Sequence, residues 1–189
     1  WLTNFTQPQN RQYDGRLIVD IAEMRNQDPE DALFDLLVEE NLGISTVGLG
    51  TNPHTLWAFV SHPMGMIASD AILFGEYPNP RTYGCFPIVL AEFVRAEKHL
   101  SLPEAIRKMT SFPAQRLGIP DRGLLRDGFK ADIVLFNPDT VKTHATKEDP
   151  KHYPVGIDYV IVNGRVVIDQ GENTGALPGR GLRRGRSST

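Results

Sequence analysis

The residue pattern changes near Gly118, and this change constrains the fold more than any other feature of the chain. Before it, helical segments alternate with short apolar runs that are rich in β-branched residues and glycine. After residue 122, short apolar runs are joined by tight-turn signals. Alternating helices and strands are typical of an α/β fold, whereas strands joined by two-residue turns are antiparallel. We therefore expect an α/β region followed by an all-β region.

Capping signals define the helices of the α/β region. Asp28, followed by Pro29 and two acidic residues, predicts a helix that ends near residues 41–43. The buried face expected for this helix consists of Ala32, Leu33, Leu36 and Leu37. Other helices are expected over 17–25, 53–60 and 86–98, from a capping box at 101–104, and from Thr110 to a stop at Gly118. Short buried strands are expected at 45–49 and 64–69.

A long irregular segment, 71–84, follows the second expected strand and favours a functional loop. Asp70 stands where that strand ends, so its carboxylate can project into a pocket at the carboxyl edge of a sheet. The alternative is a turn or N-cap aspartate. Arg81 and Tyr83 lie in the same loop, and a guanidinium suits a substrate carboxylate. The alternative for Arg81 is a surface ion pair with Glu76.

Two hairpins are expected in the all-β region. In the first, residues 123–125 pair with 131–136 across an Asp-Gly turn, and in the second, 159–162 pair with 165–168 across Asn163-Gly164. Between them, residues 137–156 are polar and contain several prolines.

Charge and cysteine content exclude several classes of protein. Twenty basic and 23 acidic residues leave a formal charge of −3, which supplies no attraction for nucleic acid or an anionic membrane. The basic tail over 181–189, together with Arg180, is interpreted as a solvated terminus rather than an RNA- or lipid-binding arm. No run approaches the 18 or so apolar residues of a membrane span. The single cysteine, Cys85, fits a reducing cytoplasm and is interpreted as a buried structural thiol rather than a nucleophile.

The five histidines do not show a metal-binding spacing. Neither H-x-H nor H-E-x-x-H is present, and no histidine has the spacing to the single cysteine that a zinc site requires. His99, His144 and His152 are interpreted as surface residues, and His62 as part of a turn, with a functional role as the alternative.

Two groups of motifs resemble a known family. Two segments are similar to the C-terminal part of the amidohydrolase superfamily. They are residues 109–136, which begin with MTSFPAQRLGI, and residues 159–171, YVIVNGRVVIDQG. Two further segments resemble the N-acyl-D-amino-acid deacylases (D-aminoacylases) within this superfamily. They are SHPMGMIASDA and NPRTYGCFPIVLAEFVRAEKHLSLPEAIRKMT. The resemblance implies the last units of a metal-dependent (β/α)8 barrel over 1–121, part of a small β-sandwich over 122–180, and a basic tail.

The resemblance also implies roles for the loop residues. Asp70 corresponds to the aspartate that closes the eighth barrel strand, acts as general base and then acid, and is at most a weak or indirect metal ligand. Arg81 would hold the substrate carboxylate, with Tyr83 beside it. The family usually has histidine where this chain has Asn79.

Most metal ligands of this family have no counterpart in the chain. Zinc needs about three protein ligands to activate water, so we expect Zn²⁺ in the complete enzyme and none tightly bound to this chain alone. The chain also lacks an initiator Met and is interpreted as a fragment that binds a complementary N-terminal portion or self-associates. The expected substrate is a small-molecule N-acyl-D-amino acid. The alternatives are a dihydroorotase- or hydantoinase-like enzyme and a non-catalytic scaffold domain.

Overall fold

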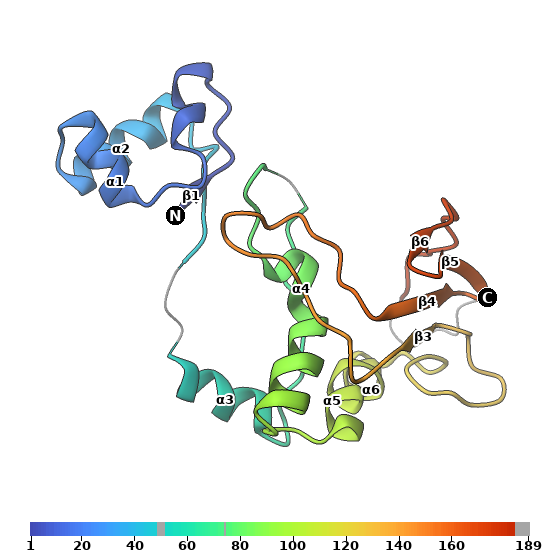
Figure 1. Cartoon of the computed structure of the whole chain (residues 1–189). Helices are drawn as coiled ribbons and strands as arrows, with labels where there is room; N and C mark the ends of the chain where they lie inside the picture. Colours follow the sequence, from blue (N-terminus) through green and yellow to red (C-terminus); the bar gives the residue numbers. More distant parts are fainter. Residues whose placement is uncertain (49–51, 74, 184–189) are drawn as a thin grey trace. The chain divides into compact units, whose positions relative to one another are not determined.

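The computed structural model describes residues 1–48, 52–73 and 75–183, which form two compact units (Figure 1). The first unit takes its described residues from 1–51, 70–83 and 145–152. The second takes its described residues from 52–69, 84–144 and 153–189. Each unit has its own buried apolar cluster.

The first unit is a small helical body with a two-stranded sheet. Its elements are β1 (Leu2–Thr3), the 3₁₀ segment Pro8–Tyr13, α1 (Ile18–Arg25), α2 (Pro29–Glu39) and β2 (Ser45–Thr46). The helices α1 and α2 pack side by side, and β1 pairs with β2 antiparallel (Figure 1). Its core consists of Leu2, Phe5, Tyr13, Ile21 and Leu36.

The sequence signals for α2 are confirmed. The Asp28 side chain accepts a hydrogen bond from the Glu30 backbone N–H at 2.9 Å, as expected of an N-cap. On the predicted apolar face, Ala32 and Leu36 are fully buried, and the other two residues are half-buried.

The second unit combines helices with a four-stranded sheet. Its helices are α3 (Pro53–Ser61), α4 (Arg81–Ile88) from residue 84 onward, the π-helical segment Val89–Ala96 that continues α4, α5 (Leu102–Met109) and α6 (Ser111–Leu117). The strands β3 (Ile133–Phe136), β4 (Ile157–Val162), β5 (Arg165–Asp169) and β6 (Glu172–Asn173) follow in that order across an antiparallel sheet.

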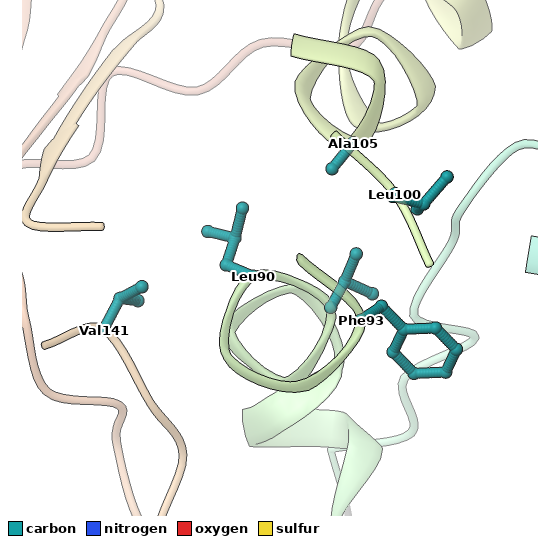
Figure 2. Close-up of a cluster of buried hydrophobic side chains, with 6 residues drawn as sticks. Leu90, Phe93, Leu100, Ala105 and Val141 are labelled. Atoms are coloured by element: carbon teal, nitrogen blue, oxygen red, sulfur yellow. The ribbon is translucent and has the colours of Figure 1, made fainter. Parts of the chain in front are cut away.

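The core of the second unit lies where the π-helical segment meets α5 and the segment 137–144. Figure 2 shows five of its side chains, Leu90, Phe93, Leu100, Ala105 and Val141. All are at least nine-tenths buried, so this cluster fixes the position of α5.

The Asn163-Gly164 hairpin is confirmed. Both residues have positive φ, 49° and 76°, which a two-residue turn of the primed type requires. The Ser101 cap at 3.4 Å from the Glu104 N–H and the left-handed Gly118 that ends α6 are confirmed as well.

Three expectations about secondary structure are wrong. Residues 64–69 form no strand. Their backbone forms a hydrogen bond with α5 and not with a neighbouring strand, since the Ile67 N–H donates to the Lys108 carbonyl at 3.2 Å. Residues 123–125 form no strand either: the Asp-Gly turn forms, but Gly123 has a φ of 85°, outside the β region, and β3 pairs with β4 instead. The helix expected over 86–98 begins at Arg81, inside the expected loop.

The strand expected at 45–49 is reduced to Ser45–Thr46, and Leu49 lies outside the described residues. Every strand pair in the described part of the chain is antiparallel. The barrel and sandwich assignments over 1–121 and 122–180 therefore stay predictions. None of the helices among the described residues is long and apolar enough to cross a bilayer.

Candidate functional site

The structure joins Asp70 and Arg81, the two candidate residues with opposite charges. The Arg81 Nη2 atom lies 2.6 Å from Asp70 Oδ2, and the same nitrogen is 3.4 Å from the Asp70 carbonyl oxygen. The Asp70 side chain is 83% exposed and that of Arg81 47% exposed. This ion pair is therefore open to solvent and to a small polar molecule.

Local sequence explains how the two side chains meet. The Asn79 side chain accepts a hydrogen bond from the Arg81 N–H at 3.0 Å, and Pro80 follows it, so Arg81 stands in the first turn of α4. Asp70 has a φ of 46°, a left-handed conformation that aspartate tolerates better than most residues. The Asn-Pro signal was present in the sequence and could have placed the start of this helix.

Tyr83 is not part of this ion pair. It stands two residues after Arg81 in α4, and side chains two positions apart on a helix point in different directions. Tyr83 is half-buried in the first turns of α4. The role that the resemblance assigns to Tyr83 stays a prediction.

Glu76 does not take the place of Asp70 as the partner of Arg81. Its carboxylate pairs with Lys151 at 2.9 Å, and the hydrogen bond from that ammonium group lowers the pKa of Glu76. The predicted ion pair between Arg81 and Glu76 is therefore wrong, because Arg81 pairs with Asp70 and Glu76 pairs with Lys151.

The segment that leads to Asp70 is anchored by two basic residues of α5 that the sequence interpretation missed. Lys108 Nζ donates to the carbonyl oxygens of His62 and Gly65, the second at 3.0 Å. Arg107 Nη2 donates to the Pro63 carbonyl at 3.1 Å. These bonds hold the turn before residues 66–70 against α5.

Lys108 is fully buried, and desolvation lowers its pKa despite the opposing attraction of Glu104. Its spacing could have revealed this position, because Lys108 lies three residues after the fully buried Ala105 on the same face of α5. Gly65 is required in the turn, since a Cβ there would lie 2.5 Å from the Phe59 carbonyl oxygen.

The other sequence candidates take structural positions. His62 is exposed, and its Nδ1 accepts a hydrogen bond from the Met64 N–H at 3.2 Å, as the turn interpretation predicts. His99 is half-buried and stacks on Trp57 with ring centroids 4.7 Å apart, so its interpretation as a surface residue is wrong. Cys85 is half-buried rather than buried, and its thiol lies 3.5 Å from the Ala68 carbonyl.

The residues present do not fit a complete metal site. A catalytic zinc takes about three protein ligands, commonly His, Cys or carboxylate. The part of the chain that the structure describes has no group of three such side chains arranged around one point. Asp70 is one carboxylate ligand at most, and its Oδ2 atom already contacts Arg81.

The Asp70–Arg81 pair places a carboxylate and a guanidinium where a small polar molecule can reach both. Comparison with known proteins shows the family of the chain. The model of the amidohydrolase family matches residues 51–168, which is more than half of the chain. The chain belongs to the amidohydrolase family.

The curated relatives of the chain include deacylases of N-acyl-D-amino acids. It is 47% identical over 123 residues to the N-acyl-D-aspartate deacylase of Alcaligenes xylosoxydans xylosoxydans, covering 65% of this chain and 24% of the relative. It is 42% identical over 119 residues to the D-aminoacylase of the same organism, covering 63% of this chain and 25% of the relative. The predicted resemblance to this family is thereby confirmed.

A solved structure also resembles this chain. The N-acyl-D-glutamate deacylase of Bordetella bronchiseptica, complexed with zinc and a phosphonate inhibitor, superposes with a TM-score of 0.81 at 31% identity. The match covers 88% of this chain and 34% of that protein. The chain thus spans about a quarter to a third of the length of these relatives.

Proposed function

We propose that this chain is the C-terminal part of a zinc-dependent deacylase that hydrolyses the linear amide of N-acyl-D-amino acids. The products are a D-amino acid and a carboxylate. The observation that carries the proposal is the exposed Asp70–Arg81 pair, in a chain whose relatives are named for this reaction. The low cysteine content of the chain, one in 189 residues, supports a cytoplasmic location in this proposal.

Asp70 is the proton-transfer group in this proposal. Its carboxylate accepts a proton from the attacking water as the water oxygen bonds to the amide carbon. It then donates that proton to the amide nitrogen as the C–N bond breaks. High exposure leaves the carboxylate accessible to both water and substrate.

Arg81 is the substrate-binding group. Every N-acyl amino acid carries an α-carboxylate, and the planar guanidinium can bind two carboxylate oxygens at once. Because Arg81 already contacts Asp70, a carboxylate bound there would lie close to the proton-transfer group. The role of Tyr83 in substrate binding rests on the family resemblance alone, because its side chain and that of Arg81 leave α4 in different directions.

In the complete enzyme, zinc would polarise the amide carbonyl and acidify the water. The residues that the structure describes include no group of three metal ligands, so we expect no tight zinc binding by this chain alone. The exposed apolar residues Leu125, Val134 and Leu135 suit contact with a complementary N-terminal portion or self-association.

The test is an assay of the full-length protein encoded by the gene, including any sequence that precedes Trp1. Purified with zinc, it should release the free D-amino acid from N-acetyl-D-aspartate or another N-acetyl-D-amino acid, and act much more slowly on the L-enantiomers. An upstream His-x-His motif should accompany this activity. A folded, zinc-loaded protein that hydrolyses only cyclic amides, or no amide, would overturn the proposal.

A further inference from the structure

A basic pocket lies in the second unit, formed only by residues of that unit. It has a volume of about 370 Å³, within the range of small-molecule sites. Its eight lining residues, all described by the structure, include four cationic side chains and no carboxylate. The four cations are Arg122, Lys130, Arg165 and Arg180.

The cations come from four places in the sequence. Arg122 and Lys130 flank the Asp-Gly turn, Arg165 begins β5, and Arg180 lies in the segment after β6. Charges that are solvated independently repel one another and spread apart, so their convergence on one concave surface requires the fold to hold them there.

Asn163 connects the walls of this pocket. Its side-chain oxygen accepts a hydrogen bond from Arg122 Nη2, and its Nδ2 donates to the Pro178 carbonyl at 2.7 Å. Its backbone N–H donates to Asp132 Oδ1 at 2.8 Å, and Asp132 also pairs with Arg122. The hairpin turn thus links Arg122 to the segment 177–180 that closes the pocket.

The arrangement leaves positive charge at the pocket surface. Arg122 has only 9% of its side chain exposed, and Asp132 balances its charge. Arg165 is exposed and Lys130 is half-buried, so their charged ends can reach a ligand. Two such cations exceed the single negative charge of a monocarboxylate and match the nearly two negative charges of a phosphate group, which also has three acceptor oxygens.

We infer that this pocket binds a small phosphorylated molecule through Lys130 and Arg165, with Arg122 and Arg180 in the pocket wall. The site is separate from the residues assigned to deacylation, and it does not rest on the proposed function. Its ligand is a small anion rather than nucleic acid, because the pocket is small and local, and the chain as a whole is acidic.

The experiment titrates inorganic pyrophosphate into the full-length protein by calorimetry at constant ionic strength. Saturable binding at one site is expected, with Arg165→Gln weakening it about tenfold, the scale of one charge-assisted hydrogen bond. Arg116→Gln is the matched control, because Arg116 is an exposed arginine of α6 outside the pocket, and its affinity should equal that of the wild type.

Citrate separates phosphate recognition from attraction to any multivalent anion, and it should bind at least tenfold more weakly than pyrophosphate. Equal affinities for citrate and pyrophosphate would overturn the phosphate assignment. Absence of saturable pyrophosphate binding, or equal weakening by Arg165→Gln and Arg116→Gln, would overturn the site. Deacylase activity should be unchanged in Arg165→Gln, so failure here is distinguishable from failure of the proposed function.

Discussion

Two carboxylates of the first unit, Glu40 and Asp70, have opposite surroundings. Glu40 is 3% exposed and accepts hydrogen bonds from Thr6, Gln7 and Asn10, the closest being 2.7 Å from the Thr6 hydroxyl. Asp70 has 83% of its side chain exposed and one ion pair with Arg81. A buried acid surrounded by donors stabilises the fold, whereas an exposed acid remains available to water and substrate.

The environment of Glu40 also lowers the pKa of its carboxyl group. Desolvation alone would raise the pKa of Glu40, but the hydrogen bonds from Thr6, Asn10 and Gln7 together lower it. Glu40 joins the end of α2 to the segment around Thr6, which are distant in sequence. The comparison predicts that changes at Glu40 affect stability and changes at Asp70 affect chemistry.

Asp70→Asn should give the largest effect on activity. In the full-length enzyme we expect kcat to fall at least about 100-fold, the usual scale for loss of a general acid–base, with zinc content near normal. Because the side chain is mostly exposed, the free energy of unfolding should change by no more than about 0.5 kcal/mol. Steady-state kinetics measures kcat, metal analysis measures the zinc content, and urea unfolding measures the free energy of unfolding. Asp20→Asn is the control, because Asp20 is an exposed aspartate of α1. Retention of most activity would remove Asp70 from the mechanism.

Glu40→Gln should give the opposite result. The amide replaces one acceptor oxygen by a donor that faces other donors, so we expect a loss of about 2 kcal/mol in the free energy of unfolding. Urea unfolding of the full-length protein measures it. Glu23→Gln, on an exposed position of α1, should change stability by less than about 0.5 kcal/mol. Equal stability of the two variants would contradict the structural role of Glu40.

Arg81→Lys should change substrate selection. Lysine keeps the charge but not the two-pronged geometry, so we expect KM for an N-acetyl-D-amino acid to rise about tenfold. The preference for this substrate over its carboxamide analogue, measured as a ratio of kcat/KM values, should shrink. An unchanged ratio would show that Arg81 does not bind the substrate carboxylate.

The smallest expected effect is a pH dependence of stability. Because the pKa of Glu40 is lowered in the folded state, its contribution is fully present above the unfolded value of about 4.3 and is lost as pH falls through the folded value. Stability should therefore decline below about pH 4.3, and less steeply in Glu40→Gln than in the wild type. Urea midpoints between pH 3 and pH 6 test this, and identical slopes for the two proteins would contradict it.

Local signals in the sequence were enough for much of the secondary structure. The Asp28 cap, the Ser101 cap, the Gly118 stop and the Asn163-Gly164 turn depend on residues within a few positions of one another. Such interactions are short-range, so they can be predicted from the printed order of residues.

Predictions that required a distant partner succeeded less often. The strand at 64–69 was inferred from apolar composition, but its backbone is bonded to α5. The hairpin at 123–125 failed because β3 has a better partner in β4, more than 20 residues later. Composition does not specify which strand lies next to which.

For the candidate site, the sequence by itself determined the residue types and the family, because Asp70, Arg81 and the surrounding motifs can be compared directly with relatives. Only the tertiary structure decided that Asp70 pairs with Arg81 while Glu76 pairs with Lys151. It also decided that Lys108 is buried and that four cations converge around Asn163. The physical reason is that hydrogen bonds and ion pairs act over a few ångströms in space, and folding brings together groups that the sequence separates by up to 75 positions.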